Sequence, residues 1–125
     1  GEASFEVVGD VARFRLTGEQ VLESAVQLIA DAITRTKEAG LDKLLVDITG
    51  IRGIEPPGMS TRLWLMGEWA RAGRGHVRTV LVVRREFIDP IGSGFISNVF
   101  ETEPQALDWL LGIRGRDSSK PTSEP

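Results

Sequence analysis

The fold of this chain is decided by one short stretch, Lys43-Leu44-Leu45-Val46-Asp47-Ile48. Its apolar residues follow one another without polar alternation, which is typical of a strand buried on both faces of a parallel sheet. The chain then runs through Thr49-Gly50 and Glu55-Pro56-Pro57-Gly58 into a helical pattern that begins near Met59. We therefore expect a helix N-terminus just beyond the carboxyl edge of the strand, where open α/β sheets place their binding sites.

The composition indicates one ordinary globular domain. The chain has 125 residues, of which 41% are hydrophobic and 26% are charged. Its net charge of −3, with cations spread along the sequence, argues against binding to nucleic acid or to an anionic membrane surface. There is no cysteine for a disulfide or a thiolate metal site, and no apolar run approaches the ~20 residues that span a bilayer. We expect a cytoplasmic domain over residues 1–112 and a disordered tail over residues 113–125.

The N-terminal third predicts a hairpin followed by a helix. Two alternating segments, residues 4–8 and 11–16, flank a Gly-Asp pair that is typical of a two-residue turn. The sequence Thr-Gly-Glu-Gln at residues 17–20 matches a capping box, so we expect the first helix to begin there. Apolar residues then recur at helical spacing as far as Ile33, and Gly40 fits the left-handed position that ends a helix.

The remaining elements alternate between helices and strands. A second helix is expected over residues 59–72, with an inward stripe made by Met59, Leu63, Met66 and Ala70 and widened by Leu65 and Trp69. A strand over residues 77–83, a short helix over 89–97 and a short edge strand over 98–100 follow. A second capping box at residues 102–105 opens the last helix, which Gly112 ends. The fold class is therefore α/β, with a mixed sheet of about five strands and four helices.

This order of elements resembles the STAS fold over about residues 3 to 111. The residues that carry the resemblance are Leu45-Val46-Asp47-Ile48, Phe100-Glu101-Thr102-Glu103 and Ala106-Leu107-Asp108-Trp109-Leu110. The closing pattern is similar to uncharacterised bacterial STAS-like proteins related to anti-sigma-factor antagonists and to CRAL-TRIO lipid-binding domains. The resemblance implies a domain that regulates by binding a protein and that is not an enzyme.

The loop before the second helix departs from this family. In anti-sigma-factor antagonists it resembles Asp-Ser-Ser-Gly, and phosphorylation of the second Ser by a partner kinase switches binding off. Here Pro57 occupies that position, so the chain lacks the hydroxyl that the switch requires. Ser60 and Thr61 follow in the first turn of the helix, where the preference of such residues for helix starts favours a structural role over phosphorylation.

No catalytic, metal or cofactor site is expected. The only histidine, His76, precedes a strand at the amino edge of the sheet and is interpreted as a solvated turn residue, so no Ser-His-Asp triad can form. Three acids near the C-terminus, Glu101, Glu103 and Asp108, are interpreted as capping and surface charges rather than as metal ligands. Hydrolysis with Glu55 as a general base is disfavoured because no nucleophile or second acid lies beside it in the sequence.

Two binding hypotheses remain. In the first, the loop and the second helix meet a protein partner or a second copy of the chain, through the residues Glu55, Gly58, Met59 and Arg62. In the second, an apolar pocket carries a small apolar or anionic ligand, with its wall formed by Trp64, Met66, Phe87 and Phe95 and its anionic head group held by Arg84 or Arg85. The alternatives are a solvated turn for the two arginines, and for Trp64 either self-association or packing against residues 87–95.

Overall fold

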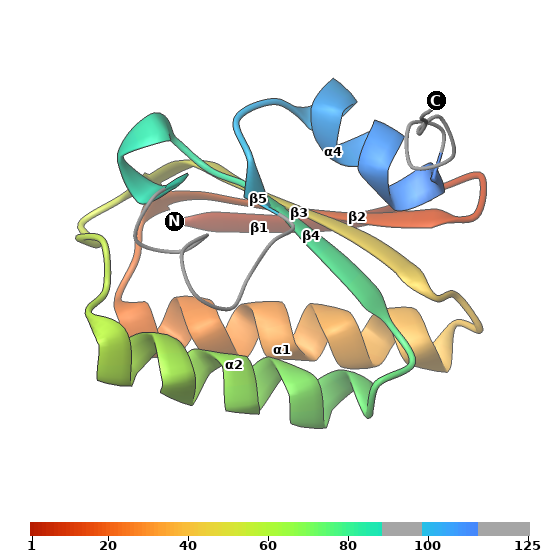
Figure 1. The fold of residues 1–125 in the computed structure, drawn as a ribbon, viewed down its shortest axis with the longest axis horizontal. Coiled ribbons are helices and arrows are strands. Elements are labelled where there is room, and N and C mark those ends of the chain that lie inside the picture. Colours follow the sequence, from red (N-terminus) through yellow and green to blue (C-terminus); the bar gives the residue numbers. More distant parts are fainter. Residues whose placement is uncertain (89–98, 113–125) are drawn as a thin grey trace, which may run out of the picture.

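A five-stranded mixed sheet forms the centre of the structure, which is a computed structural model describing residues 1–88 and 99–112 (Figure 1). The strands lie side by side in chain order: β1 (Glu2–Val8), β2 (Val11–Glu19), β3 (Lys43–Arg52), β4 (Arg78–Val82) and β5 (Val99–Phe100). Strands β1 and β2 are antiparallel, and the pairs from β2 to β5 are parallel. The predicted hairpin and mixed sheet are therefore confirmed.

Helices cover both faces of the sheet. Figure 1 shows α1 (Leu22–Glu38) and α2 (Met59–Gly73) side by side on one face and α4 (Glu103–Leu111) on the other. Within β3, Leu44 and Val46 belong to the core under α1 and α2, whereas Leu45 belongs to the smaller core under α4. All three side chains are almost completely buried. The apolar run of β3 has no polar alternation because both of its faces are covered.

The helix start predicted at residues 17–20 is wrong. Strand β2 continues through these residues to Glu19, and α1 begins only at Leu22. The reason is tertiary: this segment pairs with the end of β3, and the Gln20 N–H donates to the Arg52 carbonyl at 3.0 Å. The Gln20 side-chain amide donates to the Thr17 carbonyl. In a capping box, the Gln20 side chain would instead bond the Thr17 backbone N–H. Pairing with a neighbouring strand thus overrides a local capping pattern.

The inward stripe predicted for α2 is wrong in part. Met59 and Leu63 are 53% and 59% exposed, whereas Leu65 is buried and Trp69 packs against the core. The Trp69 indole N–H donates to the Val26 carbonyl of α1 at 3.1 Å. Because Leu65 and Trp69 are four residues apart, they share one helix face, and docking of this face on α1 turns Met59 and Leu63 toward solvent.

The C-terminal part is anchored by a short 3-10 helix and a capped helix. The 3-10 helix spans Arg85–Phe87, and α4 is capped by Thr102, whose hydroxyl accepts from the Gln105 N–H. This confirms the second capping box. The described residues contain three α-helices; the fourth helix, expected over 89–97, and the expected tail over 113–125 lie outside them. None of the helices in the described parts is long and apolar enough to cross a membrane.

Candidate functional site

The loop between β3 and α2 lies at the carboxyl edge of the sheet. After β3 ends at Arg52, the chain continues without regular structure to Gly58, which is the N-cap of α2 and offers no side chain to the free N–H groups of the first turn. Glu55, Gly58 and Met59 are exposed and Arg62 is half-buried. The structure therefore places the four residues proposed for partner binding along one continuous segment.

The first two turns of α2 present large apolar side chains to solvent. Met59 is 53% exposed, Leu63 is 59% exposed and Trp64 is 41% exposed. We call these three residues the α2 apolar face. They lie next to the loop, since Met59 is the first residue of the helix. Isolated exposed apolar residues are common, but three large ones within six residues of a helix start are typical of an interaction surface.

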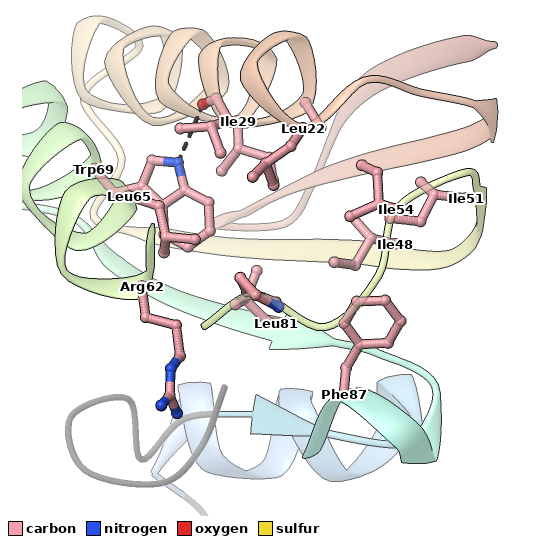
Figure 2. Close-up of a pocket in the computed structure, with 13 residues that line it drawn as sticks. Leu22, Ile29, Ile48, Ile51, Ile54, Arg62, Leu65, Trp69, Leu81 and Phe87 are labelled. Carbon is pink, nitrogen blue, oxygen red and sulfur yellow. Dashed lines mark hydrogen bonds between the residues drawn. The ribbon is translucent and has the colours of Figure 1, made fainter. Parts of the chain in front are cut away.

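A small apolar cavity lies under the loop, between α1, α2 and the sheet (Figure 2). Its volume is about 40 Å³, and its lining is apolar apart from Arg62. The lining includes Ile29, Ile51, Leu65, Trp69 and Phe87. Pockets that hold drug-sized ligands measure roughly 300–1,000 Å³. This cavity has room for a water molecule or two, and it would have to open to admit anything larger.

Of the residues expected to line a ligand pocket, Phe87 lines this cavity. Trp64 lies on the exposed side of α2, and Met66 packs at the edge of the core without lining the cavity. Trp69, which the sequence placed beside the inward stripe, lines the cavity, whereas Trp64 does not. Phe95 lies outside the described residues.

Arg84 and Arg85, which were proposed to hold the anionic head group of a ligand, contact other groups of the protein instead. Arg84 Nη1 donates to the Ile51 carbonyl at 2.5 Å, and its Nε donates to Glu86 at 3.0 Å. The Arg85 side chain is 86% exposed and pairs with Glu101 at 2.7 Å. Neither arginine lines the cavity. Arg84 instead holds the end of β3 in place, and Arg85 lies in an exposed ion pair.

A cluster of charged groups on the α4 side of the sheet was not predicted. Asp47 of β3 is buried, and its Oδ1 accepts from the Thr49 N–H at 2.9 Å and from the Thr49 hydroxyl at 2.7 Å. Glu103, at the start of α4, lies beside Asp47 and pairs with Arg13 at 2.7 Å and Arg15 at 3.0 Å. The cluster ties the start of α4 to two strands.

Burial and the neighbouring Glu103 raise the pKa of Asp47 above its ordinary value. The hydrogen bond from Asp47, with those from Arg13 and Arg15, lowers the pKa of Glu103 to about 2. Because the two pKa values shift in opposite directions, Asp47 takes up a proton before Glu103 does as the pH falls. The single acid inside an apolar strand was the only sequence signal for this cluster, because Glu103 alone matches an ordinary residue at a helix start.

The described residues offer little for metal chemistry. No group of three or more potential ligands comes together within residues 1–88 and 99–112. His76 is exposed in the turn after α2, where the sequence placed it.

Comparison with known proteins identifies the fold. No protein family model matches the chain, and no curated protein matches it. An anti-sigma factor antagonist from Mycobacterium paratuberculosis superposes with a TM-score of 0.64 and 17% identity, over 88% of this chain and 93% of that one. The chain has a STAS-like fold.

Two further structures support this assignment. The anti-sigma factor antagonist SpoIIAA in its unphosphorylated form matches the STAS-like domain with a TM-score of 0.57 and 21% identity, over 90% of this chain and 99% of that one. The Bacillus cell fate determinant SpoIIAA in its phosphorylated form gives a TM-score of 0.54 and 21% identity, over 90% and 100%. The resemblance inferred from the sequence is thus confirmed at the level of the fold.

Proposed function

We propose that this STAS-like domain is a cytoplasmic, non-enzymatic regulatory module that binds a protein partner. The surface proposed for binding combines the α2 apolar face with the loop that precedes it, including Glu55, Gly58 and Arg62. The observation that carries the proposal is the exposure of three large apolar side chains at one helix start. The fold shared with anti-sigma factor antagonists supports a regulatory role through protein binding.

We further propose that binding is not switched at the position used by anti-sigma-factor antagonists. Pro57 has no hydroxyl, and it is half-buried against the apolar cavity. Ser60 is exposed and Thr61 is half-buried in the first turn of α2. Because residue 57 has no hydroxyl, a partner would meet this surface without the family's phosphorylation switch at that position.

Carriage of a small apolar or anionic ligand is the alternative function. The cavity of about 40 Å³ gives it weaker support than the exposed surface gives to protein binding. Native mass spectrometry of the freshly purified protein separates the two. A bound mass of a few hundred daltons that is lost on denaturation would support carriage, whereas the bare chain mass would support the interaction module.

The proposed surface can be tested with matched leucine variants. Leu63→Asp places a carboxylate on the α2 apolar face, and Leu111→Asp places one at a 44% exposed leucine on α4, on the other face of the sheet. A partner captured from the source cells by the unaltered chain should lose at least about tenfold in affinity with Leu63→Asp, equivalent to about 1.4 kcal/mol, and should bind Leu111→Asp normally. Equal binding by both variants would show that the partner uses another surface.

A further inference from the structure

The edge strand β1 has one free side. Within residues 1–88 and 99–112 it pairs only with β2, and every residue from Glu2 to Val8 is exposed except the half-buried Phe5. The strand contains no proline and no lysine, residues that commonly block pairing at a sheet edge. The opposite edge is the two-residue strand β5. Thus β1 is an open seven-residue edge that can accept another strand.

The turn of the hairpin decides which backbone groups face outward. A two-residue turn makes the closing pair, Val8 and Val11, a hydrogen-bonded pair. Hydrogen-bonded and non-hydrogen-bonded pairs alternate along an antiparallel ladder. The N–H and C=O groups of Ala3, Phe5 and Val7 therefore point away from β2, toward the free side. These three residues also share the sheet face covered by α1, since Val7 is paired with Ala12 and Phe5 with Phe14 in the core beneath it.

We propose that the occupant of this edge is β1 of a second copy of the chain, running antiparallel with Phe5 opposite Phe5. In this register Ala3 lies opposite Val7 of the second copy, so the three outward residues form three hydrogen-bonded pairs with about six hydrogen bonds. The two strands then form one continuous sheet across both copies. The two-fold axis passes between the two Phe5 residues.

The sequence of β1 selects this register over its two neighbours. A shift in one direction would place Glu2 opposite Glu6, and a shift in the other would place Glu6 opposite Glu6. Both shifts set like charges against each other, which destabilises an antiparallel pair. In the proposed register Glu6 faces Ser4, whose hydroxyl can donate to the carboxylate, and Glu2 faces Val8. Arg13 also neutralises Glu6 within each copy, at 2.8 Å.

The face toward α1 is suited to the same pairing. A groove of about 230 Å³ lies between β1 and α1, and its lining includes Phe5, Leu28, Asp31 and Arg35. The Arg35 guanidinium lies 4.3 Å from the centre of the Phe5 ring. In the proposed pair, the grooves of the two copies would lie side by side. Each would contribute one Arg35 and one Asp31, so the charges near the paired Phe5 rings would balance.

Disulfide trapping tests the register directly, because the chain contains no cysteine. The variant Phe5→Cys should form a covalent dimer under mild oxidation, since this residue faces itself across the axis at a Cα separation of about 5.5 Å. The variants Ser4→Cys and Glu6→Cys are the controls, because each faces itself only in one of the shifted registers. Cross-linking of either control in preference to Phe5→Cys would overturn the proposal.

A second trapping experiment avoids any change to Phe5, which packs against the core. Ala3→Cys mixed with Val7→Cys should give a covalent dimer at least tenfold faster than either variant alone, because these residues face each other only between copies. Equal rates in the mixture and in the separate variants would contradict the pairing.

Sedimentation velocity then measures the association without cross-links. The unaltered chain and Val7→Thr should sediment at twice the monomer mass, whereas Val7→Pro should sediment as a folded monomer. Proline removes an N–H that faces outward, so the β1–β2 ladder is kept. A monomeric unaltered chain, or a dimer that survives Val7→Pro, would overturn the proposal. A dimer lost in Leu63→Asp and kept in Val7→Pro would place the second copy on α2 and would overturn it as well.

Discussion

Replacing Asp47 by asparagine should stabilise the fold at neutral pH, although it removes a buried carboxyl group from a cluster of ion pairs. The side chain of Asp47 accepts two hydrogen bonds from Thr49 through one oxygen, and an amide oxygen can accept both. The Asp47 carboxyl also lies beside Glu103, whose pKa is lowered by Asp47, Arg13 and Arg15. An amide N–H can donate to that carboxylate at every pH, whereas Asp47 can donate only while it holds a proton.

The expected gain is about 1 to 2 kcal/mol at pH 7. A hydrogen bond to a charged group contributes about 1.5–3 kcal/mol, and in the native chain this gain is offset by keeping a proton on Asp47 or by burying a second negative charge. The variant loses the contact with Arg15 at 3.8 Å, which is half-exposed and contributes about 0–1 kcal/mol. Because the folded pKa of Asp47 is raised, the native chain loses stability as pH rises above the ordinary aspartate value. The difference between variant and native chain should therefore vanish below about pH 3.9 and grow above it.

Urea denaturation followed by far-UV circular dichroism at several pH values from 3.5 to 7 measures the gain in stability at pH 7 and its dependence on pH. Glu103→Gln is the control, because it should destabilise the fold at pH 7. Its parent carboxylate has a pKa lowered to about 2, so it contributes stability above the ordinary value of 4.5 and loses it as pH falls toward 2. Glu103→Gln should cost about 1 kcal/mol at pH 7, and less in acid. If Asp47→Asn also destabilised the fold at pH 7, the raised pKa of Asp47 and its cost to stability at neutral pH would be refuted.

Three further substitutions test the packing around the site. Leu65→Ala should cost about 2–5 kcal/mol in urea denaturation, whereas Leu63→Ala, on the same helix but exposed, should change stability by less than about 0.5 kcal/mol; similar losses would contradict the orientation of α2. Trp69→Phe should cost about 0.5–1.5 kcal/mol through loss of the 3.1 Å hydrogen bond to α1, and an unchanged unfolding midpoint would argue against that bond. Arg84→Ala should raise amide hydrogen exchange in residues 49–54, because it removes donors to the Thr49 and Ile51 carbonyls; unchanged protection there would show that the loop is held in another way.

The sequence was a good guide where a pattern depends on burial alone. The run at residues 43–48 predicted a central parallel strand, because helices on both faces of the sheet bury its side chains and only Asp47 interrupts the apolar sequence. The capping pattern at residues 102–105 also predicted a helix start correctly. The same kind of pattern failed at residues 17–20, where β3 offers backbone partners that continue the strand. The same local capping pattern therefore starts a helix in one place and not in the other, depending on whether a neighbouring strand offers backbone partners.

The candidate site was predicted less completely than the fold. The sequence located the segment from Glu55 to Arg62 at the carboxyl edge, but it did not show which side of α2 faces solvent. That side depends on how Leu65 and Trp69 dock on α1, and α2 has apolar residues on several faces. The pairing of Asp47 with Glu103 was equally hidden, because it joins β3 to a helix that lies far away in the chain.

The two edges of the sheet differ greatly in length, and this has a consequence for assembly. The edge strand β1 offers seven residues, while β5 is paired along two. A sheet with long free edges on both sides can add copies indefinitely and grow into a filament. Here, pairing between two β1 strands would use up the long edge of each copy and leave only the short ones. Growth would stop at two chains. A free edge strand that would promote aggregation in another sheet would here limit the assembly to a dimer.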